Sequence, residues 1–327
     1  MLSNHVYYRA FGDARYRREE VRHATLLFCA LERWGLVKQG AEREIANMES
    51  RTITTEGFMR ELEQHGRRHR WYFHYTTLNV MEKILENGSL LLAQVSKMND
   101  GRESKTVGDN LFATCFSHGL PESVAMWNAY GIPRHDAVRL CFDGRIVRKF
   151  LDGKFGPFRC RALDKNRAFI ENVPPDKIEL TMADIAYASL NERYSRYRDI
   201  RYTVMGEDGN DKNLLDGHFA GYVKMEGWNY ERETRLLLKL KNYVVPGLAY
   251  IALDFGAVVD FGELSFNVCP VMLGPWTKPG KFQEIRRRGL KVGKSAFTGY
   301  LDNLKTICSK CEDVCRKKCK CKHKDAM

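Results

Sequence analysis

Hydrophobic residues at helical spacing mark the start of the chain. Between residues 18 and 37 they recur every three to seven positions, which predicts an amphipathic helix. A second, shorter helix is predicted over 54–66, with Thr54 or Thr55 as its N-cap and Gly66 near its end. No arrangement in residues 1–67 suggests chemistry. We interpret this part as a helical N-terminal region that caps the rest or binds a partner.

From residue 68 the pattern changes to short apolar strands separated by helices. A helix over 78–87 is predicted with Thr76 or Thr77 as N-cap and Gly88 at its end. Residues 191–202 and 207–219 predict a loop and helical insertion. Few connections are long enough for the crossovers of a doubly wound sheet, so we predict an α+β domain over 68–300. The other predicted strands and helices are strands 71–75, 89–94, 111–117, 136–144, 184–190, 228–240, 247–261, 264–276 and 290–297, and helices 121–131 and 279–289.

Composition narrows the class of protein. The 327 residues are 44% hydrophobic and 29% charged, which is typical of a globular protein. The longest apolar runs are too short or too interrupted to span a bilayer, and the charged N-terminus does not resemble a signal peptide. We therefore expect a cytoplasmic protein without membrane contact. The chain contains neither a P-loop nor a dinucleotide-binding glycine fingerprint.

The chain is basic, with 53 Lys and Arg against 41 Asp and Glu, a formal net charge of +12. The last nineteen residues contribute +4 of this, from seven basic and three acidic residues. A basic surface favours polyanions such as nucleic acid, acidic proteins or phosphorylated small molecules. Charge alone does not choose among these partners, and many basic surfaces are merely solvated.

The C-terminal tail, 301–327, concentrates half of the ten cysteines. Thiolates and an imidazole at short spacings can hold zinc in a tetrahedral site. The spacing matches no standard zinc module, so a reduced basic tail that binds metal only adventitiously stays open as the alternative. The other five cysteines are scattered through apolar contexts and are expected to be reduced core residues. The candidate metal ligands of the tail are Cys308, Cys311, Cys315, Cys319, Cys321 and His323.

The stretch WNYERETRLLLKL, residues 228–240, combines charge with a run of leucines. On a strand, Glu231, Glu233 and Arg235 would share one face, because residues two apart point the same way. A solvent-exposed face with ion pairs is the ordinary interpretation. The leucines favour a central strand instead, and buried carboxylates need partners. A carboxylate held in a cleft is then a candidate for function.

Two further stretches carry candidate residues. His74 lies in an aromatic strand, where alternation places it with Tyr72 and Thr76 and opposite Tyr75. A hydrogen-bonded core histidine is the alternative there. In MWNAYG, Tyr130 follows Met126 by four residues on one helical face, for which core packing is the alternative.

Taken in order, these motifs resemble a widespread family of uncharacterised bacterial domains. The matching elements are His-Tyr-Thr at 74–76, Asn-Asp-Gly-Arg-Glu at 99–103, Cys-Phe-Ser at 115–117, Met-Trp-x-x-Tyr at 126–130 and Tyr-Glu-x-Glu-x-Arg at 230–235. Gly101 stands where that family has proline, and Thr234 where it has tryptophan. The resemblance covers 72–297 discontinuously. The family is similar in layout to ADP-ribosyltransferases of the His-Tyr-Glu type, which bind NAD in a cleft between two small antiparallel sheets.

The resemblance implies a fold and a set of roles. The fold would be α+β, with split antiparallel sheets, flanking helices and the N-terminal helical region added. Glu233 would be the catalytic carboxylate, Glu231 would orient the acceptor or act as general base, and Tyr130 would stack on the nicotinamide ring. His74 would bond a ribose hydroxyl, with Thr76 near the nicotinamide end. The residues expected to bind NAD are His74, Tyr75, Thr76, Ser117 and Arg235, with Lys97, Arg102 and Lys278 as candidate phosphate contacts.

The activity that the resemblance implies is NAD-dependent mono-ADP-ribosylation of a macromolecule, protein or nucleic acid, in a toxin or an anti-phage defence system. The alternative is a non-catalytic nucleotide- or nucleic-acid-binding module with a zinc-binding tail. A metal-dependent hydrolase is a weaker interpretation, because the nine histidines show no helical ligand pair. His65 and His69 are four apart, but in an Arg-rich segment broken by glycine. The acceptor and the oligomeric state stay open.

Overall fold

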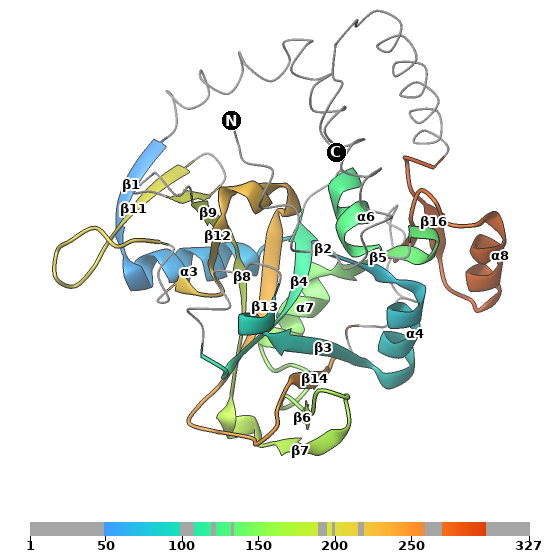
Figure 1. Cartoon of the computed structure of the whole chain (residues 1–327), viewed down its shortest axis with the longest axis horizontal. Helices are drawn as coiled ribbons and strands as arrows, with labels where there is room; N and C mark the ends of the chain where they lie inside the picture. Colours follow the sequence, from blue (N-terminus) through green and yellow to red (C-terminus); the bar gives the residue numbers. More distant parts are fainter. Residues whose placement is uncertain are drawn as a thin grey trace, which may run out of the picture. The chain divides into compact units, whose positions relative to one another are not determined.

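The computed structural model describes residues 49–98, 108–118, 122–131, 134–188, 195–197, 200–214, 219–256, 258 and 270–298. Residues Glu49–Thr298 form one compact unit (Figure 1). Three predictions lie outside the described residues. These are the helix over 18–37, the loop over 99–103 with Arg102, and the cysteine-rich tail with Cys308, Cys311, Cys315, Cys319, Cys321 and His323.

The unit is a mixed α+β structure built on two sheets, as the sequence predicts at the level of class. The larger sheet has the order β16-β15-β5-β2-β4-β3-β14-β6-β7, and β13 pairs with both β4 and β8. Its pairings are antiparallel except that of β15 with β16. Its strands are β2 (Trp71–Thr77), β3 (Ser89–Gln94), β4 (Leu111–His118), β5 (Ala137–Asp143), β6 (Cys160–Leu163), β7 (Phe169–Val173), β8 (Ile178–Asp184), β13 (Glu233–Leu240), β14 (Tyr250–Asp254), β15 (Val271–Leu273) and β16 (Val292–Lys294).

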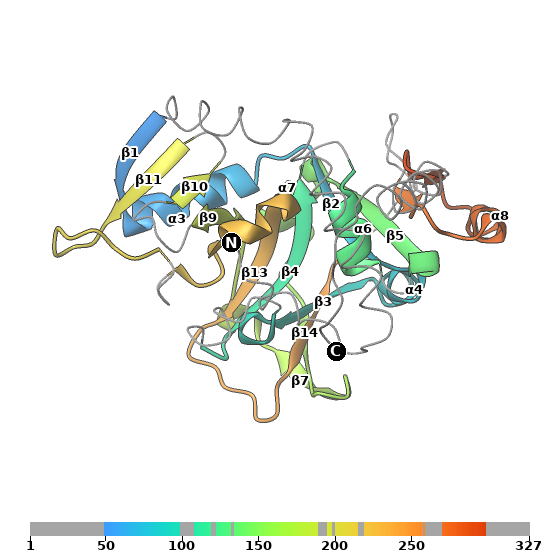
Figure 2. The same ribbon diagram turned by 45° about the horizontal axis from the view of Figure 1, so that its top comes forward.

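This sheet forks along one edge of β4. One edge of β4 pairs with β13 over seven residues. The other edge pairs with β2 only at Ser117 and His118, and with β3 only at Phe112 and Ala113. Beyond these short ladders β2 stays with β5 and β3 stays with β14, so two groups of strands diverge from β4 (Figure 2). We call the unpaired stretch of this edge, residues 114–116, the fork.

The smaller sheet has the order β1-β11-β10-β9-β12. Its strands are β1 (Glu49–Thr54), β9 (Ala186–Ala188), β10 (Ser195–Tyr197), β11 (Ile200–Met205) and β12 (Val223–Met225). The prediction of a loop and helical insertion is therefore wrong for β10 and β11. These segments pair as strands because Tyr197, Tyr202 and Val204 are buried in a core with Phe58 and Leu62 of helix α3 (Thr55–Gly66).

Two helices, α3 and α4 (Leu78–Asn87), begin and end where local signals predict. Helix α4 starts at Thr77, whose hydroxyl accepts a hydrogen bond from the backbone of Val80. It ends at Gly88 in the left-handed conformation (φ 57°), which glycine adopts without a steric penalty. Helix α3 starts at Thr54 in the same way. The remaining helices are α6 (Val124–Tyr130), α7 (Gly144–Leu151), α8 (Pro279–Arg287) and the 3-10 turns η2 (Val95–Lys97), η3 (Arg134–Asp136), η4 (Pro175–Lys177) and η6 (Glu226–Glu231).

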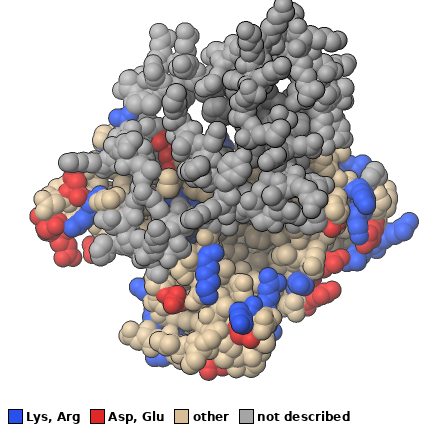
Figure 3. Space-filling model, in the orientation of Figure 1, with Lys and Arg blue, Asp and Glu red and all other residues tan. Residues whose placement is uncertain are grey.

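The two faces of the central strands differ in chemistry. On one face, Tyr72, Phe116 and Leu236 belong to the main apolar core. On the other, Phe73 and Tyr75 pack with Trp127 of α6, and the charged residues of β13 lie on this same face. No helix in the described residues is long and apolar enough to cross a membrane. Figure 3 shows both basic and acidic side chains on the described part of the surface that faces the viewer.

Candidate active site

The two glutamates of the YERETR stretch do not lie on one strand. Glu231 ends the 3-10 turn η6, Arg232 adopts the left-handed conformation (φ 43°, ψ 56°), and β13 begins at Glu233. The predicted alternation is therefore wrong for Glu231 and holds only for Glu233 and Arg235. The physical reason is the turn at Arg232, a backbone conformation that is uncommon and strained for a residue other than glycine.

The turn nevertheless brings both carboxylates to one amine. Lys224 of β12 lies with its Nζ 2.7 Å from Oε2 of Glu231 and 2.8 Å from Oε2 of Glu233. Arg235 donates from Nε to Oε1 of Glu233 at 2.7 Å. All four side chains are at most 5% exposed. Two carboxylates and two cations thus form a buried group without net charge, and we call these four residues the charge cluster.

The two carboxyl groups are driven in opposite directions by their surroundings. Burial favours the neutral form of both. At Glu233 the nearby Arg235 and Lys224 outweigh burial and hold its pKa far below the usual range. At Glu231 burial prevails over Lys224, and the charge of Glu233 adds to it, so the pKa is raised. Such a pair provides a permanently ionised carboxylate beside one that can exchange a proton.

Tyr130 joins this cluster from a distant part of the chain. Helix α6 contacts β2 and η6, and the Tyr130 hydroxyl donates to Oε1 of Glu231 at 2.5 Å. Burial and the carboxylate raise the pKa of Tyr130 well above its usual value, so it stays a donor. Its ring packs with the aromatic group of Phe73 and Trp127. The structure therefore brings together four of the predicted site residues: Tyr130, Glu231, Glu233 and Arg235.

Strand pairing places Glu233 beside the mouth of the fork. Glu233 is opposite Ser117, which is opposite Phe73 in the last pair before β2 and β4 separate. Cys115 lies next along the same face, and burial together with the charge of Glu233 raises the pKa of its thiol. The Tyr187 hydroxyl accepts a hydrogen bond from the backbone nitrogen of Glu233 at 2.9 Å. Carboxylate, thiol and hydroxyl groups thus meet where the sheet opens.

His74 lies in the fork but is not brought to Glu233. Its Nδ1 is 2.9 Å from the carbonyl oxygen of Cys115, so this nitrogen carries the proton. It donates to a carbonyl group in the fork, which has no partner on a described neighbouring strand. Its ring lies beside Phe116, on the face away from Glu233. Burial lowers the pKa of His74 and favours the neutral ring. A contact of His74 with a ribose stays a prediction.

The other predicted NAD-binding residues are spread more widely. Tyr75 lies on the same face as Glu233, and its hydroxyl accepts from the backbone nitrogen of Ser123 at 3.3 Å. Thr76 is buried, one residue further along β2 and hence on the opposite face. Lys97 lies in η2 and Lys278 precedes α8. Within the described residues neither lysine forms an ion pair with the charge cluster.

Sequence reasoning missed the lysine that holds the cluster together. Lys224 lies between Val223 and Met225 on a three-residue strand, and only the pairing of β12 with β9 brings it beneath Glu231. Its apolar neighbours are the one sequence signal of burial. Its Nζ also lies 5.1 Å from the ring centre of Trp228.

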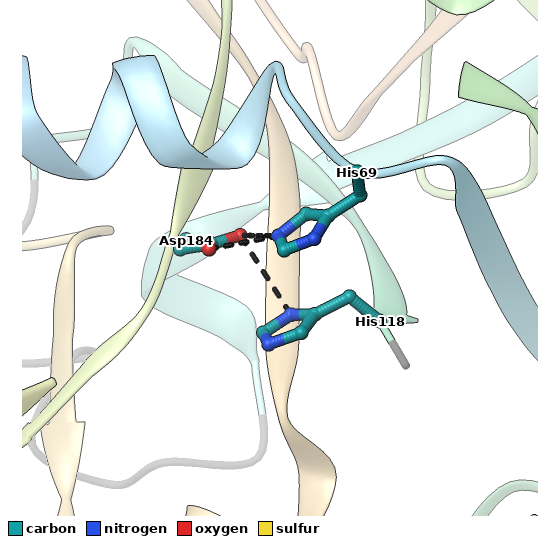
Figure 4. A group of neighbouring side chains, drawn as sticks. All are labelled: His69, His118 and Asp184. Atoms are coloured by element: carbon teal, nitrogen blue, oxygen red, sulfur yellow. Dashed lines mark hydrogen bonds and ion pairs between the residues drawn. The ribbon is translucent and has the colours of Figure 1, made fainter. Parts of the chain in front are cut away.

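A second polar cluster, also missed, occupies the opposite face of β13 (Figure 4). Asp184 is fully buried, and His69 Nε2 lies 2.7 and 2.8 Å from its two oxygens. Thr234 donates to Asp184 at 2.6 Å and accepts from Nδ1 of His118 at 2.9 Å. The two histidine rings stack with their centres 4.1 Å apart. Burial disfavours the charged carboxylate, but these donors hold the pKa of Asp184 below its usual value.

Hydrogen bonds among these side chains explain their close approach without a bound metal ion. The candidate ligand atoms of His69, His118 and Asp184 lie within 4.8 Å of one another. Ligands bound to zinc at about 2.0–2.1 Å in a tetrahedron would be roughly 3.3 Å apart. The 2.7 Å between His69 and Asp184 is instead a direct hydrogen bond, and an ion could enter only if these side chains separated.

Comparisons with known proteins identify no relative of this chain. No family model matches the chain, and neither a curated protein nor a solved structure does.

Proposed function

We propose that the protein is an NAD-dependent mono-ADP-ribosyltransferase whose reacting centre is the charge cluster at the mouth of the fork. One observation carries the proposal: the Tyr130 hydroxyl bonds Glu231, which shares Lys224 with an ionised Glu233. The tyrosine and glutamate motifs lie about a hundred residues apart and meet at one point. The divergence of β2 from β4 beside Glu233 supports the same proposal, because the enzymes that the motifs resemble bind NAD in a cleft between two antiparallel groups of strands.

The proposed reaction needs one ionised carboxylate and one carboxyl group that can accept a proton, and the charge cluster contains both. Transfer breaks the bond between nicotinamide nitrogen and ribose C1′, and nicotinamide leaves as a neutral molecule with the bonding electrons. Positive charge develops on the ribose, and the ionised Glu233 stabilises it through a fixed electrostatic interaction. The acceptor oxygen or nitrogen then bonds to C1′. Glu231, whose pKa is raised, takes the proton that the acceptor loses.

Substrate access requires one rearrangement. Glu231 and Glu233 are 2–3% exposed, and Tyr130 occupies one oxygen of Glu231. In the proposed reaction NAD binding displaces the Tyr130 hydroxyl from Glu231, which leaves the Tyr130 ring to stack on the nicotinamide. Arg235 and Lys224 keep Glu233 ionised while this happens.

The proposal is tested with NAD labelled on its adenylate part, incubated with the protein and cell extract. We expect label transfer to a macromolecule together with nicotinamide release. Glu233→Gln should slow both by about 10²- to 10³-fold, the usual effect of removing one fixed electrostatic group. The matched control is Glu179→Gln, which removes an exposed carboxylate of β8 and should leave the rate unchanged. A parent without nicotinamide release, or a Glu233→Gln variant as active as the parent, would refute the proposal.

The second candidate is a nucleotide- or nucleic-acid-binding module without catalysis. It is favoured by the internal pairing of the charge cluster, in which two carboxylates are already neutralised by two cations. Titration with short RNA and DNA at several salt concentrations distinguishes it. Phosphate contacts would make the affinity fall steeply with salt while NAD stays intact.

A further inference from the structure

Arg139, on β5, is a buried cation outside the charge cluster. Its side chain is 3% exposed, and its guanidinium lies over the ring of Phe73 with the carbon 4.3 Å from the ring centre. Its one hydrogen bond within the described residues goes from Nη1 to the Tyr75 hydroxyl at 3.5 Å. No described carboxylate lies within ion-pair distance of it.

Comparison with other arginines shows what Arg139 lacks. Arg235 is equally buried and has Glu233, Arg145 has Asp143, and Arg148 donates to the backbone carbonyls of Arg67 and His69. A buried charge is costly unless it is paired and hydrogen-bonded. A guanidinium presents five N–H donors in a planar fork. Stacking on Phe73 occupies the face of this plane and leaves most of its edge for an acceptor.

The groups around Arg139 suit an anion. The Tyr75 hydroxyl accepts from Ser123 and from Arg139, and its own proton is available to an acceptor. Tyr75 and Arg139 are directly opposite in the β2–β5 ladder. Phe73 lies opposite Ser117, and Ser117 lies opposite Glu233. Two strand spacings, roughly 10 Å, therefore separate the Phe73 backbone from that of Glu233 on the same face.

We propose that Arg139 and the Tyr75 hydroxyl form a phosphate-binding subsite, which takes the diphosphate of a nucleotide whose ribose reaches the charge cluster. A planar guanidinium beside a hydroxyl donor matches two oxygens of a phosphate group. The subsite rests on the proposed function only for the identity of the dinucleotide. Binding of a diphosphate needs no transfer chemistry.

The probes are inorganic pyrophosphate and ADP-ribose, titrated into the full chain by calorimetry. We expect saturable binding of both, weakened by salt. Arg139→Met keeps the length of the side chain and should weaken binding by about ten- to a hundredfold, the usual worth of a charged hydrogen-bonding group. Arg139→Lys should be intermediate, because it keeps the charge but loses the planar fork. Tyr75→Phe, which keeps the ring, should weaken binding by about three- to tenfold.

The matched control is Arg161→Met, which makes the same charge change at an exposed position on β6 and should bind like the parent. Equal binding by Arg139→Met and Arg161→Met would overturn the inference, as would a parent that binds neither probe. If Arg139→Met does not fold, Tyr75→Phe decides alone: affinity equal to the parent overturns the subsite.

The outcomes separate this subsite from the proposed activity. A parent that binds pyrophosphate through Arg139 but never releases nicotinamide keeps the subsite and loses the transferase. A parent that cleaves NAD, with an Arg139→Met variant of unchanged KM and unchanged pyrophosphate affinity, keeps the transferase and loses the subsite. If both hold, Arg139→Met raises the KM for NAD about ten- to a hundredfold and leaves kcat nearly unchanged.

Discussion

Replacement of Lys224 by methionine tests the electrostatics of the charge cluster most directly. Methionine keeps most of the apolar stem, so the change removes one positive charge from between two carboxylates. Glu231 and Glu233 are 2–3% exposed and would be left with Arg235 as their one remaining cation. The cluster would carry a buried net charge of −1, which it can avoid by binding one proton.

The size of the effect follows from the cost of that proton. We expect Glu231 to take it, because its pKa is already raised in the parent, where Lys224 opposes the rise. An unfolded glutamate has a pKa of about 4.3, so protonating one at pH 7 costs about 1.36 kcal/mol for each of 2.7 pH units, about 3.7 kcal/mol in all. At pH 5 the same step costs only about 1 kcal/mol.

The sign is fixed by proton linkage. The folded variant holds a proton that its unfolded chain releases above about pH 4.3. Its stability is therefore fully present at low pH and is lost as pH rises. Relative to the parent, whose Glu231 pKa is itself raised, we expect the loss in free energy of unfolding to grow by up to about 1.4 kcal/mol per pH unit between pH 5 and pH 7.

The assay is urea unfolding of the parent and Lys224→Met at pH 5, 6 and 7. Lys239→Met is the matched control, since it removes an exposed lysine from β13 and should change stability by less than about 0.5 kcal/mol. A destabilisation of Lys224→Met that is the same at all three pH values would mean that packing, and not charge, sets its cost. That result would refute the reasoning.

Three further changes test contacts in different parts of the structure. Tyr130→Phe leaves Glu231 without its hydroxyl partner and should lower the free energy of unfolding by about 1–3 kcal/mol, measured by urea titration. Asp184→Asn removes a carboxylate whose pKa is lowered by folding. The parent should lose stability as pH falls below about 4, and the variant should lack this part of the pH dependence, in acid titrations followed by circular dichroism. Gly144→Ala places a methyl group 1.9 Å from a backbone carbonyl and should destabilise by about 1–3 kcal/mol in thermal melts, whereas Gly227→Ala, with open space around it, should not.

Local signals account for the parts of the fold that the sequence predicts. The ends of α4 could be predicted because a threonine cap and a left-handed glycine act within one turn. Glu233 and Arg235 could be assigned to a central strand because the leucines after them are a long apolar run. The convergence of Tyr130 on Glu231 could be expected only from the order of motifs and not from any local pattern.

The remainder depends on long-range pairing that leaves little trace in the sequence. An arginine at position 232 does not predict a left-handed turn, because that conformation is rare outside glycine, asparagine and aspartate. Lys224 reaches the cluster through a three-residue strand, too short to show alternation. The Arg-rich segment around His69 contains no pattern that marks a site, although His69 follows α3 by three residues and bonds Asp184.

The start of β13 has a consequence for how this strand finds its place. Two consecutive residues make polar contacts on opposite faces of the strand. Glu233 pairs with Lys224 and Arg235 on one face, and Thr234 bonds Asp184 and His118 on the other. If the strand slid by one residue, a carboxylate would face the buried Asp184, and the threonine would face Lys224. Glu233 would then lie beside Asp184 without Lys224, and Lys224 would lose one of its two carboxylate partners. The leucines that follow would fit either register. The two polar clusters therefore fix the register of β13, which its apolar residues alone would leave undetermined.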